Sequence, residues 1–200
     1  MTKYVDESYF HALSGHAPED ICARALCKYV DDRYIIGVWG IDYAVDPVAK
    51  TIEPINGNGY KPHAYFYLFI IYYLLYAKHI KIIDKWISEK DMPGGTTFFR
   101  GPHEIPTRLI TDMCQNDIQL FKKACEDLNG TALKEADAAY RFSITPRIPV
   151  AVLYWIGDDD FPPEGKILYD KSITSHLTLD MVFSLAIEIC TRICNGGKMI

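Results

Sequence analysis

The chain has 200 residues, of which 49% are hydrophobic and 24% are charged. These values are ordinary for a globular protein, and the length suffices for one domain with its own core. We therefore expect a single domain over residues 1–200. The net charge of −5 and the lack of any run of lysine and arginine argue against a nucleic-acid partner.

The first 15 residues contain acidic side chains and no apolar segment of the kind found in signal peptides. We therefore expect a cytoplasmic protein whose six cysteines are reduced. The longest apolar run, residues 64–77, is shorter than the roughly 18 residues that a membrane span needs. We interpret this tyrosine-rich run as a buried helix and expect no membrane partner.

Two helices are predicted first, over residues 4–14 and 18–29, the second opening on a proline that suits a first helical turn. β-Branched and aromatic residues between positions 34 and 55 then predict an antiparallel meander of two or three strands. The tyrosine-rich helix follows over residues 62–78. Because it is apolar on nearly all sides, this helix should be central.

The second half of the chain begins with an ambiguous extended segment at 82–87. A loop at 92–106 follows, whose Pro-Gly-Gly and Gly-Pro steps exclude a long helix. The remaining predicted elements are a helix at 107–128, a short helical or irregular piece at 133–138, strands at 140–144 and 150–156, an edge strand at 166–169 and a helix at 178–194.

Helices and strands are partly segregated along the chain, which favours the α+β class. We expect a mixed or antiparallel sheet of about five strands, packed with the buried tyrosine-rich helix and the C-terminal helices. The sequence has neither the glycine fingerprint of dinucleotide-binding proteins nor a Walker loop.

Three adjacent aspartates, Asp158, Asp159 and Asp160, follow the apolar strand at the point where it leaves the core. Carboxylate oxygens bind hard divalent cations, so the triplet is a candidate metal site. One aspartate could also act as a general base, its pKa raised by its neighbours. The alternative is a structural turn, in which the carboxylates are solvated or accept hydrogen bonds from nearby backbone N–H groups.

The segment FFRGPH, residues 98–103, places Arg100 and His103 among aromatic side chains on a glycine-containing loop. An arginine and a histidine so close together are candidates for binding an anionic ligand, and His103 is also a candidate metal ligand. A structural alternative is an ion pair between Arg100 and the aspartate triplet.

A third candidate, His176, lies just before the last predicted helix. A position beside a helix N-terminus favours neutral imidazole, which is the form that binds metals. Tyr72, in the tyrosine-rich helix, is a candidate for lining a pocket for a large flat ligand, although an aromatic core explains such tyrosines equally well. A serine hydrolase is not indicated, because no GxSxG motif is present.

The segment PVAVLYWIGDDDFPPEGKILYDKSITSHL resembles the signature of the DUF3786 family, a domain of unknown function found mostly in anaerobic bacteria and archaea. The segment LLYAKHIKIIDKWISEKDMPGGTTFFRGP is similar to the family's helix and its W-I-S and P-G-G segment, but it has Glu89-Lys90-Asp91 where that segment is more apolar. The resemblance covers the chain from about residue 34 onward. It implies a cytoplasmic accessory role in anaerobic metabolism, with a loose link to corrinoid and methyl-transfer chemistry and a protein partner there.

Three hypotheses follow. The first is a module that binds a small molecule or cofactor, for example a corrinoid such as cobalamin or another tetrapyrrole, through Arg100, His103, His176 and Tyr72. The second is a metal-assisted hydrolase or transferase that uses the aspartate triplet with His103 or His176 around a divalent cation. The third is an interaction or assembly protein without a ligand.

Overall fold

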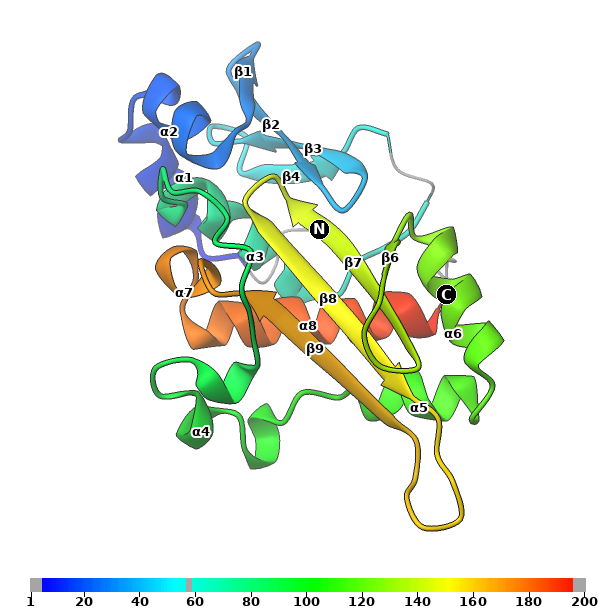
Figure 1. Cartoon of the computed structure of the whole chain (residues 1–200). Coiled ribbons are helices and arrows are strands. Elements are labelled where there is room, and N and C mark those ends of the chain that lie inside the picture. Colours follow the sequence, from blue (N-terminus) through cyan, green and yellow to red (C-terminus); the bar gives the residue numbers. More distant parts are fainter. Residues whose placement is uncertain (1–4, 57–58, 196–200) are drawn as a thin grey trace.

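The computed structural model describes residues 5–56 and 59–195 (Figure 1). Within them, two antiparallel sheets of four and five strands combine with helices, which confirms the predicted α+β class. One contiguous hydrophobic core includes residues from both sheets and from the long helices. None of the helices in the described ranges has the length and apolar character that a membrane span needs.

The N-terminal part forms the smaller sheet. The helices α1 (Glu7–Ser14) and α2 (Pro18–Ala25) precede four strands in the order β1-β2-β3-β4. The strands are β1 (Lys28–Val30), β2 (Arg33–Val38), β3 (Ile41–Asp46) and β4 (Thr51–Pro54).

The expected helix at 18–29 is too long, because Leu26 has a left-handed φ of 55° that ends α2 at Ala25. Residues 28–30 form a strand instead. Asp31 and Asp32, with φ of 49° and 59°, make the tight turn between β1 and β2. Left-handed conformation at both central residues is what the type I′ turn of a two-residue hairpin requires.

The tyrosine-rich helix α3 (Ala64–Tyr76) is central, as predicted, with eight of its residues buried. It begins after His63, whose side chain accepts a hydrogen bond from the backbone N–H of Tyr65. The hydroxyl of the buried Tyr73 donates to the carbonyl oxygen of Ala25 at 3.1 Å, which satisfies its polar tip. Helix α3 packs against α1, α2 and α8 (Leu179–Cys194).

The segment between α3 and α5 contains only single helical turns and one short strand. These are β5 (Trp86–Ile87), η1 (Glu89–Asp91), α4 (Gly95–Phe98) and η2 (Gly101–His103). The expected extended segment at 82–87 is therefore a strand for two residues only, at the edge of the larger sheet. Gly95 is required where α4 meets η1, since an added Cβ would lie 2.0 Å from the carbonyl oxygen of Glu89.

The prediction of a single helix at 107–128 is wrong. The chain forms α5 (Arg108–Cys114) and α6 (Ile118–Asp127), separated by Gln115 and Asn116 in left-handed conformation. The side chain of Asn116 accepts from the N–H of Gly157 at 2.6 Å and donates to its carbonyl oxygen at 2.9 Å. This contact with a distant loop fixes the break between the two helices.

The larger sheet has the strand order β5-β9-β8-β7-β6. Its long strands are β7 (Ala138–Thr145), β8 (Ile148–Trp155) and β9 (Glu164–Asp170), close to the predicted strands. The piece at 133–138 is not helical, because its first residue ends β6 (Thr131–Leu133) and its last begins β7. After β9, α7 (Ile173–His176) leads into α8, which passes behind the sheet in Figure 1.

Candidate functional site

Two of the predicted site residues, Tyr72 and His176, line the same hollow on the surface. This hollow of about 220 Å³ lies between the end of α3 and α7. A neighbouring hollow of about 360 Å³ shares Thr174, Leu177 and Thr178 with it. We call the two hollows together the α7 groove; it is lined by Tyr72, Tyr76, Lys78, Met92, Pro93 and residues 174–179.

The two ends of the α7 groove differ in chemistry. At one end, the rings of Tyr72 and Tyr76 have centroids 4.4 Å apart, and Lys78 follows them in the chain. At the other end, Met92 and Leu179 give an apolar lining. Aromatic faces, one cation and an apolar wall suit a small molecule with an apolar body and an anionic group.

His176 is almost fully buried, with 2% of its surface exposed. Burial, with a further contribution from the charge of Arg147, lowers its pKa to about 4. The imidazole is therefore neutral at pH 7, as predicted, although burial has the largest effect and the helix N-terminus is not among the causes.

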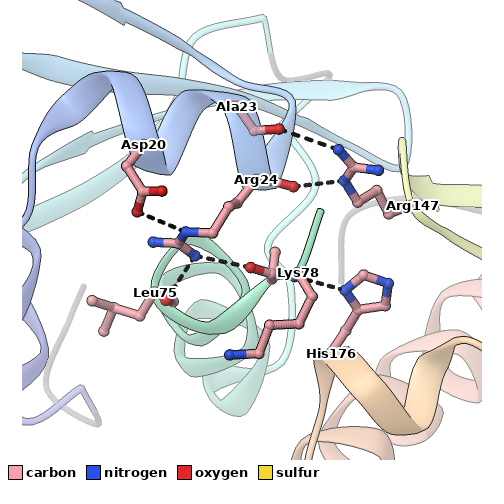
Figure 2. A network of polar contacts seen from close by, with 8 residues as sticks. Asp20, Ala23, Arg24, Leu75, Lys78, Arg147 and His176 are labelled. Atoms are coloured by element: carbon pink, nitrogen blue, oxygen red, sulfur yellow. Dashed lines mark hydrogen bonds and ion pairs between the residues drawn. The ribbon is translucent and has the colours of Figure 1, made fainter. Parts of the chain in front are cut away.

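The hydrogen bond of His176 fixes its tautomer. Its Nδ1 accepts from the backbone N–H of Lys78 at 3.1 Å (Figure 2). Nδ1 thus holds a lone pair, so the single proton of the neutral ring lies on Nε2. Nε2 is buried and has no hydrogen-bond partner in the described part of the chain. In this tautomer Nε2 is a donor, without the lone pair that a metal would need.

A network of hydrogen bonds holds the chain segment just before Lys78 in place (Figure 2). The guanidinium of Arg24 donates to the carbonyl oxygens of Leu75 and Ala77 at 3.0 and 2.9 Å. These bonds satisfy carbonyls at the C-terminal end of α3 that lack helical partners. They also fix the direction in which the chain leaves α3 towards Lys78.

Arg147 ties the same region to the β7–β8 turn. It is 7% exposed and donates to the carbonyl oxygens of Arg24 and Ile80 at 2.6 and 2.7 Å, and to that of Ala23 at 3.1 Å. The N–H groups of the guanidinium thus bridge α2 and the segment after α3. Arg147 is buried and does not line the groove.

The FFRGPH segment lies outside the α7 groove lining. His103 stacks on Phe98 with ring centroids 4.5 Å apart and meets Phe183 of α8 edge-on at 5.3 Å. Arg100 is exposed at the start of η2. The ion pairs of the described ranges do not join Arg100 to the aspartate triplet, so that alternative is wrong.

The aspartates occupy the exposed loop between β8 and β9, which projects from the body in Figure 1. Asp158 accepts from the backbone N–H groups of Asp160 and Phe161 at 3.0 and 2.8 Å, which is the geometry of a structural turn. Over residues 5–56 and 59–195, no three histidine, cysteine or acidic side chains converge as a metal site would require. Metal binding by Asp158, Asp159 and Asp160 stays a prediction.

The loop that contains FFRGPH and the loop between β8 and β9 line two adjoining hollows, but they do so with residues other than the predicted site residues. A hollow of about 270 Å³ is lined by Phe99 and Glu104 on one side and by the start of β9 on the other. It adjoins a hollow of about 450 Å³ that Pro162 and Pro163 line. Arg100, His103 and the aspartates are not among the lining residues.

Sequence reasoning missed Tyr76 and Lys78 of the groove. The four-residue spacing of Tyr72 and Tyr76 was a usable signal, because such residues share a helix face. Arg147 gave no signal, since its role depends on carbonyl groups of distant segments.

The buried pair Glu188 and Arg192 on α8 was also missed. Glu188 accepts from the N–H of His63 at 2.8 Å, and burial raises the pKa of its carboxyl group. The guanidinium of Arg192 lies 4.6 Å from the ring centroid of Trp39 and donates to its carbonyl oxygen at 3.1 Å. These contacts join the β2–β3 turn and the start of α3 to α8.

Fold and groove together define an α+β protein with a polar, aromatic and apolar surface depression beside a buried neutral histidine. The family described as "Domain of unknown function (DUF3786)" matches residues 17–192, and the chain belongs to this family. No curated protein and no solved structure matches it.

Proposed function

We propose that the protein binds a small organic molecule in the α7 groove and acts as a binding module. The observation that carries this proposal is the convergence of Tyr72, Tyr76, Lys78 and His176 at one hollow. Ligand pockets typically have roughly 300–1,000 Å³. The hollow of about 360 Å³ lies near the lower end of this range, and the hollow of about 220 Å³ lies below it.

The ligand class follows from the groove lining. The rings of Tyr72 and Tyr76 offer faces for an aromatic or apolar body. The ammonium group of Lys78 attracts a carboxylate or phosphate at the same end. Met92 and Leu179 extend the apolar surface for a longer ligand. An aromatic carboxylate has all the required features.

A corrinoid or another tetrapyrrole is the finer form of this proposal, with a methyl-transfer partner as its context. The groove residues do not fit axial ligation of cobalt, because Nε2 of His176 carries the proton and Nδ1 is engaged by Lys78. Such a ligand would bind through its edge and its peripheral polar groups.

Saturation-transfer NMR with naphthalene carboxylates, together with equilibrium dialysis of hydroxocobalamin against the protein, tests both forms. We expect binding of the carboxylate to weaken about tenfold in Lys78→Met, because a charge-assisted contact is lost. This variant keeps the backbone N–H that holds His176. Tyr72→Ala should also weaken binding.

Lys134→Met is the matched control, since Lys134 is an exposed lysine that does not line the groove. Equal affinity in wild type, Lys78→Met and Tyr72→Ala would contradict the assignment of the groove. Retention of hydroxocobalamin by the protein in dialysis that Tyr72→Ala abolishes would support the corrinoid form, and no retention by wild type would contradict it.

A further inference from the structure

Two of the cysteines, Cys22 and Cys27, are in contact at the end of α2. Their sulfur atoms are 3.7 Å apart, and both side chains are half-buried. Among the six cysteines, Cys194 is also half-buried, while Cys114, Cys125 and Cys190 are buried. The pair is therefore within reach of reagents in solution.

The contact follows from how α2 ends. Leu26 has left-handed backbone angles, and the carbonyl oxygen of Cys22 accepts from the N–H of Cys27 at 3.3 Å. This is the helix-ending motif in which the side chains three positions before and two positions after the helix end meet, usually as a hydrophobic pair. In this chain both of these positions are cysteines.

We propose that Cys22 and Cys27 form an oxidisable dithiol, which low-molecular-weight disulfides convert into an intrachain disulfide. The sulfur atoms need to approach by about 2 Å to reach the bond length of a disulfide. The helix-ending motif already holds the two side chains on the same side of the chain. This inference is independent of the ligand proposed for the α7 groove.

The exchange is balanced in two steps. The thiolate of Cys22 attacks one sulfur of the added disulfide and releases one thiolate, leaving a mixed disulfide on the protein. Cys27 then loses its proton to solvent and attacks the sulfur of Cys22, which releases the second thiolate. The protein loses two protons and two electrons, and the added disulfide takes them up and is reduced to two thiols.

Burial and the neighbouring Cys22 raise the pKa of the Cys27 thiol. Cys27 is thus suited to the second step, in which an adjacent sulfur is the target, and not to attack on a reagent in solution.

Treatment of the native chain with oxidised glutathione, alkylation and tryptic mass mapping test the proposal. Trypsin cuts after Arg24 and Lys28, so Cys22 and Cys27 fall in different peptides. We expect these peptides to appear joined, with two free thiols fewer per chain and reversal by dithiothreitol. Cys22→Ser and Cys27→Ser should both lose the joined peptide, and Cys27→Ser should stop at a mixed disulfide on Cys22, while Cys194→Ser should give the same joined peptide as wild type.

The wild-type map alone decides the outcome, so the proposal does not depend on the folding of any variant. Only mixed disulfides, a joined peptide from another pair, or no change after treatment would each overturn it.

Discussion

At the scale of single residues, the neutral state of His176 has a measurable consequence. The unfolded chain has the ordinary histidine pKa of 6.5, while the folded pKa is about 4. As the pH falls through this window, the unfolded state takes up the proton first, so the free energy of unfolding decreases. After allowance for screening by solvent in the groove, we expect a loss of about 2 kcal/mol.

Urea denaturation at pH 4.5 and pH 7 measures this loss, with His176→Asn as the reference. Asparagine offers an acceptor for the N–H of Lys78 and does not titrate. The difference in unfolding free energy between the two pH values should be smaller in the variant by about 2 kcal/mol. Equal differences in both proteins would show that His176 is not buried in its neutral form.

Loss of the Arg147 guanidinium should destabilise the chain strongly. Arg147→Met leaves three carbonyl oxygens without their donor, so we expect unfolding to become easier by about 3 kcal/mol. Arg141→Met, in the same hairpin and half-buried, should change stability by less than about 1 kcal/mol. Thermal and urea unfolding of both variants compare the two positions directly, and similar losses would contradict this role.

At the scale of elements, the break between α5 and α6 rests on Asn116. Asn116→Ala removes both hydrogen bonds to Gly157 and places an alanine at a φ of 67°, so we expect a loss of about 2–3 kcal/mol. Asn116→Gly removes the same hydrogen bonds without the backbone strain. The loss of unfolding free energy in Asn116→Gly, measured by urea unfolding, should therefore be about 1 kcal/mol smaller than in Asn116→Ala. A larger loss in Asn116→Gly would exclude the left-handed conformation of residue 116.

The loop between β8 and β9 makes a similar comparison possible. Asp158→Ala removes the side-chain oxygen that accepts two hydrogen bonds in the turn and should lower stability by about 1 kcal/mol. Asp159→Ala, at the next position of the exposed triplet, should change it by less than about 0.5 kcal/mol. If Asp159→Ala proved as destabilising as Asp158→Ala, the triplet would do more than form a turn.

At the scale of the whole molecule, the sequence predicted the elements whose signals are local. Short runs of β-branched and aromatic residues located β2, β3, β7 and β8, and the longest apolar run located the central α3. The division of 107–128 was not predictable, because it depends on a contact between Asn116 and a loop far along the chain.

For the candidate site too, the sequence indicated single residues but not which of them lie together. Tyr72 and His176 were singled out from their local settings, but their shared hollow depends on the packing of α3 beside α7. Arg100 and His103 were grouped with them in one predicted pocket, although His103 packs against Phe98 and Phe183. A sequence identifies candidate residues, while long-range hydrogen bonds and packing decide which of them meet.

Mapping of amide chemical-shift changes during titration with a naphthalene carboxylate is the most direct test of the α7 groove as a ligand site. The groove assignment predicts that the changes cluster at residues 72–78 and 174–179, and that they require about tenfold more ligand in Lys78→Met. Chemical-shift changes confined to the two hollows that Phe99, Glu104, Pro162 and Pro163 line would contradict it. So would the lack of any change at ligand concentrations that saturate typical weak sites.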